Sequence, residues 1–385
     1  MKPAPSWQIV LSALYNQHSA VILGTLFGLL TFVFHYLHNP YLALIFAAVS
    51  IVLLSLTVSQ VAEVLALRLD EPYGSLVLTF SAVIVEIILL FLILLEAGHN
   101  PHAMETVKGG IISAVIVDMN VLLGLAVFIG GLAFKEQEHN EDTSSTYTTI
   151  LLVAASALLV PSILHFTTGN NEGLASASLL IGAVLFIFYI AIFIFQTKTH
   201  SHFFKSTARS RMFRLKNRQN EDSDGQDDEV DVFEKMSSSL NFIALFVLIA
   251  VIGYIAEIFA TEGMQLVIEY SFPVGLAGLI IAIISVSPEI ITAIKAAKND
   301  QIQRVINIAM GASTVSIMLT VPILLAMSYA TENPLTLDFN TLQIGALILT
   351  IMLAWKTTDD GETNYFEGTS HLIIFACYTI VLAFM

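Results

Sequence analysis

Apolar stretches of about 20 residues recur along almost the whole chain, and they constrain the fold more than any other feature. A helix of this length crosses the roughly 30 Å hydrocarbon core of a bilayer. Of the 385 residues, 56% are hydrophobic and only 12% are charged, whereas soluble domains carry about 25% charged residues. The apolar runs are continuous rather than alternating, which argues against a transmembrane β-barrel. The sequence therefore predicts an all-α polytopic membrane protein.

The apolar runs and the residues that interrupt them predict eleven membrane spans. These spans cover residues 20–37, 40–67, 75–95, 109–134, 147–166, 174–195, 240–260, 273–297, 302–329, 341–355 and 369–384. Pro322, in the ninth span, is expected to kink that helix without ending it. Residues 6–17 are expected to form a short helix in the membrane interface, and the lone basic residue Lys2 argues against a cleaved signal peptide.

Basic residues predict the orientation of these spans. If the N-terminus is cytoplasmic, 15 of the 16 Lys and Arg residues fall on cytoplasmic segments, and Lys108 alone lies outside. Because Lys and Arg are enriched in cytoplasmic loops, we predict a cytoplasmic N-terminus, an external C-terminus and a location in the cell (inner) membrane. The single cysteine, Cys377, excludes an intramolecular disulfide and a cysteine metal cage.

One long predicted loop, residues 196–239, divides the chain. Its first part, KTHSHFFKSTARSRMFRLKNR, is basic and is expected to be a cytoplasmic topology signal that also touches anionic lipid. Its second part, NEDSDGQDDEVDVFE, is acidic and is either a solvated linker or a cation-sensing segment, although its spacing does not fit an EF-hand loop. The predicted organisation is an N-terminal segment with the first span (1–38), a five-helix repeat (39–195), the loop, and a second five-helix repeat (240–385).

Short matches on the two sides of this loop indicate an internal repeat. VAEVLA (61–66) recurs as IAEIFA (255–260), and the glycine of KGGIISAVIVDMN has a counterpart in IAMGASTVSIMLT. An odd number of helices in each half means that the second copy enters the membrane from the opposite face. Inverted repeats around a polar site at the midplane are typical of secondary transporters, and their symmetry supports alternating access.

Glu86 and Glu289 lie near the centres of the third and eighth spans, at matching places in the two halves. A charge at the bilayer centre costs about 2.5–3.5 kcal/mol, so such a residue normally faces a cavity, a partner or an ion. Burial favours the protonated form of a carboxyl group, whereas a hard divalent cation requires ionised oxygen ligands. Cations and protons would therefore compete for these two side chains. The alternative is a pair of protonated glutamates that hydrogen-bond between helices.

Other intramembrane polar groups extend the predicted site. Pro288 removes a helix hydrogen bond and frees a carbonyl near residue 284. Hydroxyl groups, which also serve ordinary helix–helix hydrogen bonding, supply further candidate oxygen ligands. These hydroxyls belong to Ser285, Ser287, Ser313, Thr314 and Ser316.

Four further polar residues have predicted roles. Asp118 and Asn120, in AVIVDMNVLLG, are predicted to be secondary cation ligands or groups on a proton path. Glu63 and Glu257 lie near the ends of their spans. They are either points of cation access on the two faces of the membrane or ordinary interfacial residues.

Three stretches carry a resemblance to a known family: AEVLALRLDEPYGSLVLTFSAVIVEIILL, FQTKTHSHFF and SPEIITAIKAAKNDQIQRVINIAMGASTVSIMLTVP. The chain resembles the calcium/cation antiporter superfamily, specifically its bacterial Cha-type calcium/proton (sodium/proton) antiporter branch. The resemblance implies eleven transmembrane helices in total, made up of one extra N-terminal helix and two inverted five-helix repeats. It also implies that one glutamate of each repeat, here Glu86 and Glu289, binds the exchanged cations and protons.

The chain departs from the commoner pattern of this superfamily, in which Gly-Asn precedes each glutamate. Ala82-Val83 and Ser285-Val286 stand at those places, and Pro288 resembles the proline of the sodium/calcium exchanger branch. The hydroxyl-rich stretch of the family corresponds to residues 311–314. Because amide ligands are fewer, sodium and potassium stay open as alternative cations.

The predicted function is secondary active cation/proton antiport that exports calcium, with sodium or potassium as alternative cations, in exchange for protons. The alternatives are a sodium (potassium)/proton antiporter for which calcium is a minor substrate, and a passive cation channel. The sequence lacks the paired intramembrane aspartates, the H-E-x-x-H helix and the G-x-S-x-G serine of membrane hydrolases, so an enzyme is not expected. The expected partners are membrane lipid and small inorganic cations, without nucleic acid and without a cofactor.

Overall fold

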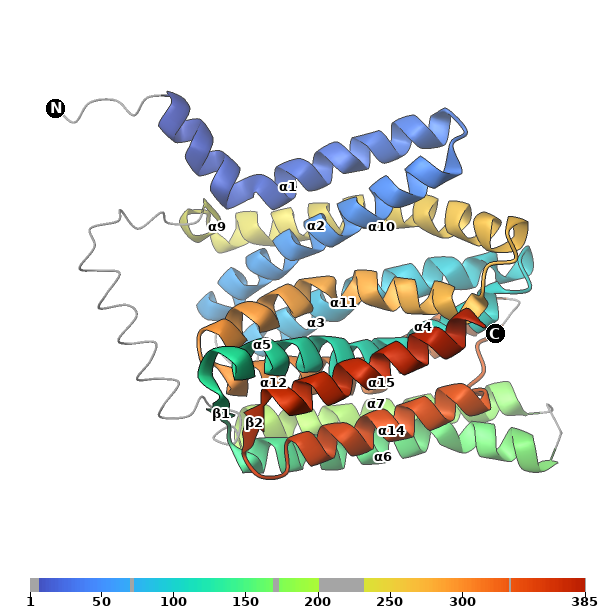
Figure 1. Ribbon diagram of the computed structural model, residues 1–385. Coiled ribbons are helices and arrows are strands. Elements are labelled where there is room, and N and C mark those ends of the chain that lie inside the picture. The colour runs from blue at the N-terminus through green and yellow to red at the C-terminus, as the bar shows by residue number, and fades with distance from the viewer. Residues whose placement is uncertain (1–6, 70–72, 169–172, 201–231, 332–333, 385) are drawn as a thin grey trace. The chain divides into compact units, whose positions relative to one another are not determined.

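The computed structural model of the chain describes residues 7–69, 73–168, 173–200, 232–331 and 334–384 (Figure 1). Helices form nearly all of the described chain. The predictions made for the charged part of the 196–239 loop fall mostly on residues 201–231, which lie outside the described residues.

The bounds of the elements follow the chain order. The first part contains α1 (Trp7–Tyr36), α2 (Pro40–Arg68), α3 (Tyr73–Leu95), the 3₁₀ turn η1 (Glu96–Gly98), α4 (Ala103–Ile116), η2 (Val117–Leu123), α5 (Gly124–Phe134), β1 (Glu136–Glu138), α6 (Glu141–Thr168), α7 (Leu174–Ile194) and η3 (Phe195–Thr199). The second part contains α9 (Val232–Lys235), α10 (Ser238–Glu269), α11 (Val274–Lys298), α12 (Ile302–Val315), η5 (Ser316–Thr320), α13 (Val321–Ser328), α14 (Thr341–Thr357), β2 (Glu362–Asn364) and α15 (Tyr365–Ala383).

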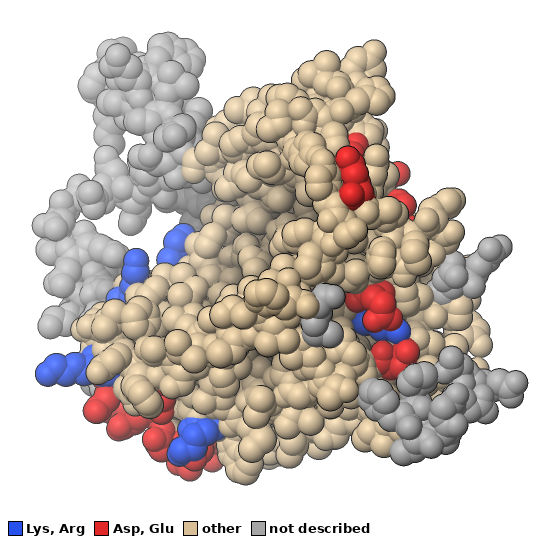
Figure 2. All heavy atoms as spheres, turned by 45° about the vertical axis from the view of Figure 1, so that its right-hand side comes forward, with Lys and Arg blue, Asp and Glu red and all other residues tan. Residues whose placement is uncertain are grey.

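All eleven predicted spans coincide with helical segments. Among the described residues, ten such segments are long and apolar enough to cross a membrane, and α14 is a shorter apolar helix of 17 residues. Residues 7–17, expected to be a separate interfacial helix, are instead the first part of α1, which is bent (Figure 1). In Figure 2 most of the visible surface of the described residues is uncharged, and the Lys, Arg, Asp and Glu side chains lie in a few groups, as expected for a lipid-facing protein. The polytopic all-α fold class is confirmed.

Two of the long spans contain an internal π-helical segment that the sequence did not predict, and a third π segment, η3, ends the span that begins with α7. η2 lies between α4 and α5, and η5 lies between α12 and α13. A π segment holds one residue more than an α turn, and such segments are frequent at functional sites. Pro322 lies in the first turn of α13, directly after η5. Its missing N–H falls where the hydrogen-bond register changes, so the helix continues to Ser328 as predicted.

The chain forms two compact units: unit 1 comprises residues 1–85 and 221–263, and unit 2 comprises residues 86–220 and 264–385. In unit 1, α1 packs along α2, and Ser50 Oγ donates a hydrogen bond to Gly24 O over 2.6 Å. Unit 2 contains every predicted cation ligand, so the site can be described within it alone.

In unit 2, α4 and α11 cross with their backbones almost in contact. A Cβ atom added to Gly278 would lie 2.6 Å from Gly110 N and 2.8 Å from Thr106 O. Only glycine fits such a crossing, because backbone atoms cannot move aside. The crossing brings α4, and η2 after it, against the helix that carries Glu289.

The two ends of unit 2 are closed by different structures. At one end, which we call the strand end, β1 pairs antiparallel with β2 (Figure 1), and the buried Gln137 donates to Asp300 Oδ1 over 3.0 Å. The opposite end of unit 2 holds residues 334–340, which directly precede α14 and which we call the strap. Leu335, Leu337 and Phe339 of the strap are buried.

Candidate cation site

Glu86 lies in the middle of α3 with its carboxylate buried against η5. Its Oε2 accepts hydrogen bonds from Ser316 Oγ at 2.8 Å and from Thr320 Oγ1 at 3.3 Å. The extra residue of a π segment widens its turn, and both hydroxyls project to the same carboxylate. Ser316 was predicted as an oxygen donor, whereas Thr320 was missed, although a Ser and a Thr four residues apart in a span were a visible signal.

Asp118 lies in η2 and is completely buried. Its Oδ2 accepts a hydrogen bond from Ser313 Oγ over 3.0 Å, so η2 and α12 meet through this pair. Its Oδ1 has no hydrogen-bond partner among the described residues. One half of this carboxyl group is thus oriented by the protein while the other half is available.

Glu289 follows Pro288 in the interior of α11. The residue is partly exposed, but its Oε2 is buried and has no hydrogen-bond partner among the described residues. The neighbouring Ser285 Oγ donates to Ala282 O over 3.0 Å, and Ser287 Oγ donates to Ile283 O over 2.5 Å. Both serine hydroxyls therefore use their hydrogen on their own helix and offer a ligand only lone pairs.

The three carboxyl groups form one electrostatic cluster. Asp118 is near enough to interact with both Glu86 and Glu289, and the two glutamates also interact with each other. In the part of the chain that the structure describes, no Lys or Arg forms an ion pair with them. Nor do the described residues contain three His, Cys, Asp or Glu side chains grouped closely enough to enclose a metal ion. The arrangement is an open cluster rather than a closed cage.

Three buried oxygens of this region have no hydrogen-bond partner among the residues that the structure describes: Asp118 Oδ1, Glu289 Oε2 and Thr314 Oγ1. Buried polar atoms are almost always hydrogen-bonded, so unpaired ones indicate a place for a water molecule, a proton or an ion. Thr314 follows Ser313 in α12, as the predicted hydroxyl-rich ligand stretch requires. Oxygen ligands of this kind suit hard cations such as calcium.

Asn120, predicted to join Asp118 as a ligand, is directed elsewhere. Its Nδ2 donates to Thr350 Oγ1 over 2.8 Å, and its Oδ1 lies 2.9 Å from His371 Nδ1. The structure therefore brings Glu86, Asp118 and Glu289 together but does not add Asn120 to them. The sequence analysis did not single out His371, which lies in the last predicted span (369–384).

The remaining predicted acidic residues lie outside the cluster. Glu63 and Glu257 belong to unit 1, and both are exposed. Their role as access points for cations stays a prediction.

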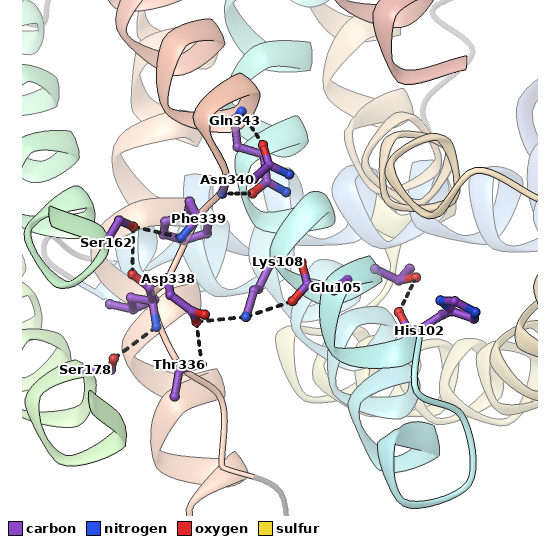
Figure 3. A network of polar contacts seen from close by, with 12 residues as sticks. His102, Glu105, Lys108, Ser162, Ser178, Thr336, Asp338, Phe339, Asn340 and Gln343 are labelled. Atoms are coloured by element: carbon purple, nitrogen blue, oxygen red, sulfur yellow. Dashed lines mark hydrogen bonds and ion pairs between the residues drawn. The ribbon is translucent and has the colours of Figure 1, made fainter. Parts of the chain in front are cut away.

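Lys108, the one basic residue predicted to lie on the external side of the membrane, is buried, and its ammonium group pairs with two carboxylates. Figure 3 shows its Nζ between Glu105 Oε1 at 2.9 Å and Asp338 Oδ1 at 2.8 Å. Burial alone would raise the pKa of Asp338, but hydrogen bonds from Lys108 and Thr336 and the charge of Lys108 lower it below its usual value. This ion pair fastens the strap to α4, so the ammonium group does not face lipid.

Side-chain hydroxyls hold the rest of the strap. Leu337 N donates to Ser178 Oγ over 3.0 Å and Phe339 N donates to Ser162 Oγ over 2.8 Å (Figure 3). These serines, from α7 and α6, replace the backbone partners that an extended segment lacks.

Comparison with known families decides the identity of this architecture. The family model described as sodium/calcium exchanger protein matches residues 39–198 and 240–384, which is most of the chain. The chain belongs to the sodium/calcium exchanger family. This membership confirms the resemblance seen in the sequence, and it places the chain in a family of transporters.

Relatives of this exchanger-family chain carry cation/proton antiport in their names. It is 29% identical over 342 residues to the sodium-potassium/proton antiporter ChaA of Escherichia coli (strain K12), covering 87% of each chain. It is 23% identical over 375 residues to the Ca(2+)/H(+) antiporter of Aphanothece halophytica, covering 93% of this chain and 95% of that one.

Solved structures show the same fold. Native YfkE superimposes with a TM-score of 0.76 at 19% identity, covering 95% of this chain and 99% of that chain. The H+/Ca2+ exchanger CAX superimposes with a TM-score of 0.69 at 16% identity, covering 96% of this chain and 93% of that chain.

Proposed function

We propose that this exchanger-family protein is a secondary active cation/proton antiporter that exports calcium, with sodium or potassium as alternative cations. The observation that carries the proposal is the cluster of Glu86, Asp118 and Glu289, whose carboxyl groups come from three membrane-spanning segments and have no basic counterpart in the described structure. The antiporters of Escherichia coli and Aphanothece halophytica support the coupling to protons.

The chemistry of the cluster accounts for exchange. Without a cation, three neighbouring carboxyl groups cannot all be ionised away from water, so protons occupy some of them. A cation that binds their oxygens stabilises the ionised forms and displaces protons. Binding of one ion therefore requires release of the other, and the same groups can carry either across the membrane.

The ligand set favours hard cations but is poor in amides. Carboxylates of Glu86, Asp118 and Glu289, with hydroxyls of Ser313 and Thr314 and the lone pairs of Ser285, are the proposed ligands. Asn120 is already engaged with two other side chains. Calcium binds six to eight oxygens, so water completes its shell in this proposal. Because the set has fewer amides than the commoner pattern of the superfamily, sodium and potassium are the alternative substrates.

Two inverted halves, residues 39–195 and 240–385, are proposed to provide alternating access. The connection from α5 to α6 lies at the strand end. The corresponding connection from α13 to α14 contains the strap and lies at the opposite end. Each half also contains one π segment in its central polar span. Both observations support oppositely oriented copies. The distribution of Lys and Arg supports a location in the inner membrane with the N-terminus cytoplasmic and the C-terminus external.

Ion fluxes in proteoliposomes test the proposal. We expect calcium, sodium or potassium added to one side to drive protons across in the opposite direction, with each cation measured separately. Glu86→Gln and Glu289→Gln, combined in one protein, should abolish this exchange. Exchange that survives the double substitution would refute the assignment of the glutamates, and cation flux without proton movement would favour the passive channel instead.

A further inference from the structure

His371 is a buried titratable residue that the carboxylate cluster does not use. It lies in the second turn of α15 and is 0% exposed. A polar ring at such a position needs partners on all its hydrogen-bonding atoms, because an unpaired buried nitrogen is destabilising.

Both ring nitrogens of His371 have partners. Nδ1 lies 2.9 Å from Asn120 Oδ1, and Nε2 lies 3.1 Å from Thr357 Oγ1. An amide oxygen only accepts, so Nδ1 carries the hydrogen and donates to Asn120. In the neutral ring, Nε2 then accepts from the Thr357 hydroxyl. With the bond from Asn120 to Thr350, a continuous network joins η2 to α14 and α15.

Glycines allow α15 to reach η2. A Cβ added to Gly124, the first residue after η2, would lie 2.8 Å from His371 Cβ and 3.4 Å from Gly368 O. A Cβ added to Gly368 would in turn lie 2.7 Å from Gly124 O. Any larger residue at these positions would push α15 away, so the close contact that seats the imidazole is built into the sequence.

Asn120 and Asp118 face different neighbours across η2. Residues two positions apart in a helix do not share a face. Asp118 accepts from Ser313 of α12, whereas Asn120 bonds to α14 and α15. One face of the π segment thus bonds to the histidine network, and another face carries the Asp118 carboxyl group of the cation site.

We propose that His371 is a positioning residue for cation binding, which acts through Asn120 to hold η2 in the register that directs Asp118 at the cluster. The inference rests on the proposed role of Asp118 as a cation ligand. A π segment that reverts to α geometry loses one residue from its turn, and a shift by one residue rotates a side chain by about 100° around the helix axis. Without its anchor, Asp118 would no longer be fixed toward Ser313 and the glutamates.

Transport kinetics of the full-length protein in proteoliposomes test this role. In His371→Leu we expect the KM for the transported cation, measured with calcium and with sodium, to rise about tenfold with the maximal rate largely retained, as for other residues that orient metal ligands. His371→Gln keeps a donor and an acceptor and should restore most of the affinity. Ser370→Ala is the matched control, because that hydroxyl bonds only to Phe366 O in its own helix.

A double substitution separates positioning from general stability. The KM of Asn120→Ala with His371→Leu should equal that of either single variant, because both act through one contact. A His371→Leu protein whose Tm falls while its KM stays at the wild-type value overturns the inference. If that variant cannot be purified, a wild-type KM in both Asn120→Ala and Thr357→Val, which remove the two partners of the ring, overturns it as well. Wild-type cation flux without proton movement overturns the proposed function instead, and exchange that survives Glu86→Gln with Glu289→Gln overturns the assignment of the glutamates. Both failures are distinguishable from failure of the His371 inference.

Discussion

Ser316 Oγ donates a hydrogen bond to Glu86 Oε2 over 2.8 Å, which ties a π segment of the second half of the chain to the central acidic residue of the first. Thr320 adds a second hydroxyl to the same oxygen. A carboxylate that accepts two hydrogen bonds is favoured in its ionised form over one without donors. These hydroxyls therefore assist cation binding without having to be cation ligands themselves.

Removal of both hydroxyls should weaken cation binding at neutral pH. A hydrogen bond to a charged group contributes about 1.5–3 kcal/mol, so Ser316→Ala with Thr320→Val should raise the KM for the cation about tenfold at pH 7. Protons compete more strongly in the variant, and assay at higher pH should restore part of the affinity. Ser156→Ala, whose hydroxyl bonds to Leu152 O of its own helix, is the control. Equal KM values for variant and wild type at every pH would contradict this account.

The crossing of α4 and α11 should not tolerate a single added methyl group. Gly278→Ala places Cβ 2.6 Å from Gly110 N, and overpacking of this kind costs about 1–3 kcal/mol or more against rigid backbone. We expect this destabilisation to appear as a lower Tm of the detergent-purified Gly278→Ala protein. Gly345→Ala in α14 is the matched control, since nothing lies within 4 Å of its added Cβ. That variant should be neutral or slightly stabilising.

The Lys108–Asp338 ion pair should matter more than its exposed counterpart. Lys108→Met leaves the Asp338 carboxylate without its cation and should destabilise the protein by about 1–3 kcal/mol, less than a fully buried pair because Asp338 retains 24% exposure of its side chain. Lys356→Met, which breaks the exposed pair with Asp359, should leave the Tm unchanged. Equal Tm values for the two variants would show that the strap is not held by this pair.

The same pair predicts an acid limit for stability. Because the folded state lowers the pKa of Asp338, its contribution is present above the ordinary aspartate value of about 3.9 and is lost as pH falls through the folded value. Thermal unfolding from pH 5 to pH 3 should show a steeper loss in the wild type than in Asp338→Asn. Parallel curves of Tm against pH for the two proteins would contradict this contribution of Asp338.

His139, at the strand end, predicts a second pH dependence of stability, at milder acidity. Burial lowers the pKa of His139, and the bond to Thr358 O and the charge of Asp360 only partly oppose this effect. The folded state therefore resists protonation, and its stability declines as pH falls below the ordinary histidine value of about 6.5. His139→Gln should flatten the Tm between pH 7 and pH 5, whereas the exposed His99→Gln should not. A decline that persists unchanged in His139→Gln would assign it to other groups.

The membrane spans were predictable because bilayer thickness imposes their length and composition. Glu86 and Glu289 were predictable for the same reason, since a carboxylate in an apolar run is costly unless it has a function. The π segments were not, because a change of hydrogen-bond register by one residue leaves hydropathy unaltered. Nor were the partners of Asn120, since Thr350 and His371 are far away in the sequence and come close only through the glycine contacts of α5 and α15.

The burial of Lys108 has a consequence for biosynthesis. Its α4 helix enters the membrane long before the ribosome has made Asp338, so a newly inserted first half carries an ammonium group whose strap partner does not yet exist. Of the two carboxylates that pair with Lys108 in the described structure, the nascent chain contains only that of Glu105 until the strap arrives. The first half should consequently remain a substrate for membrane quality control until the second half docks. Two separately expressed halves should protect each other from degradation only when Asp338 is present.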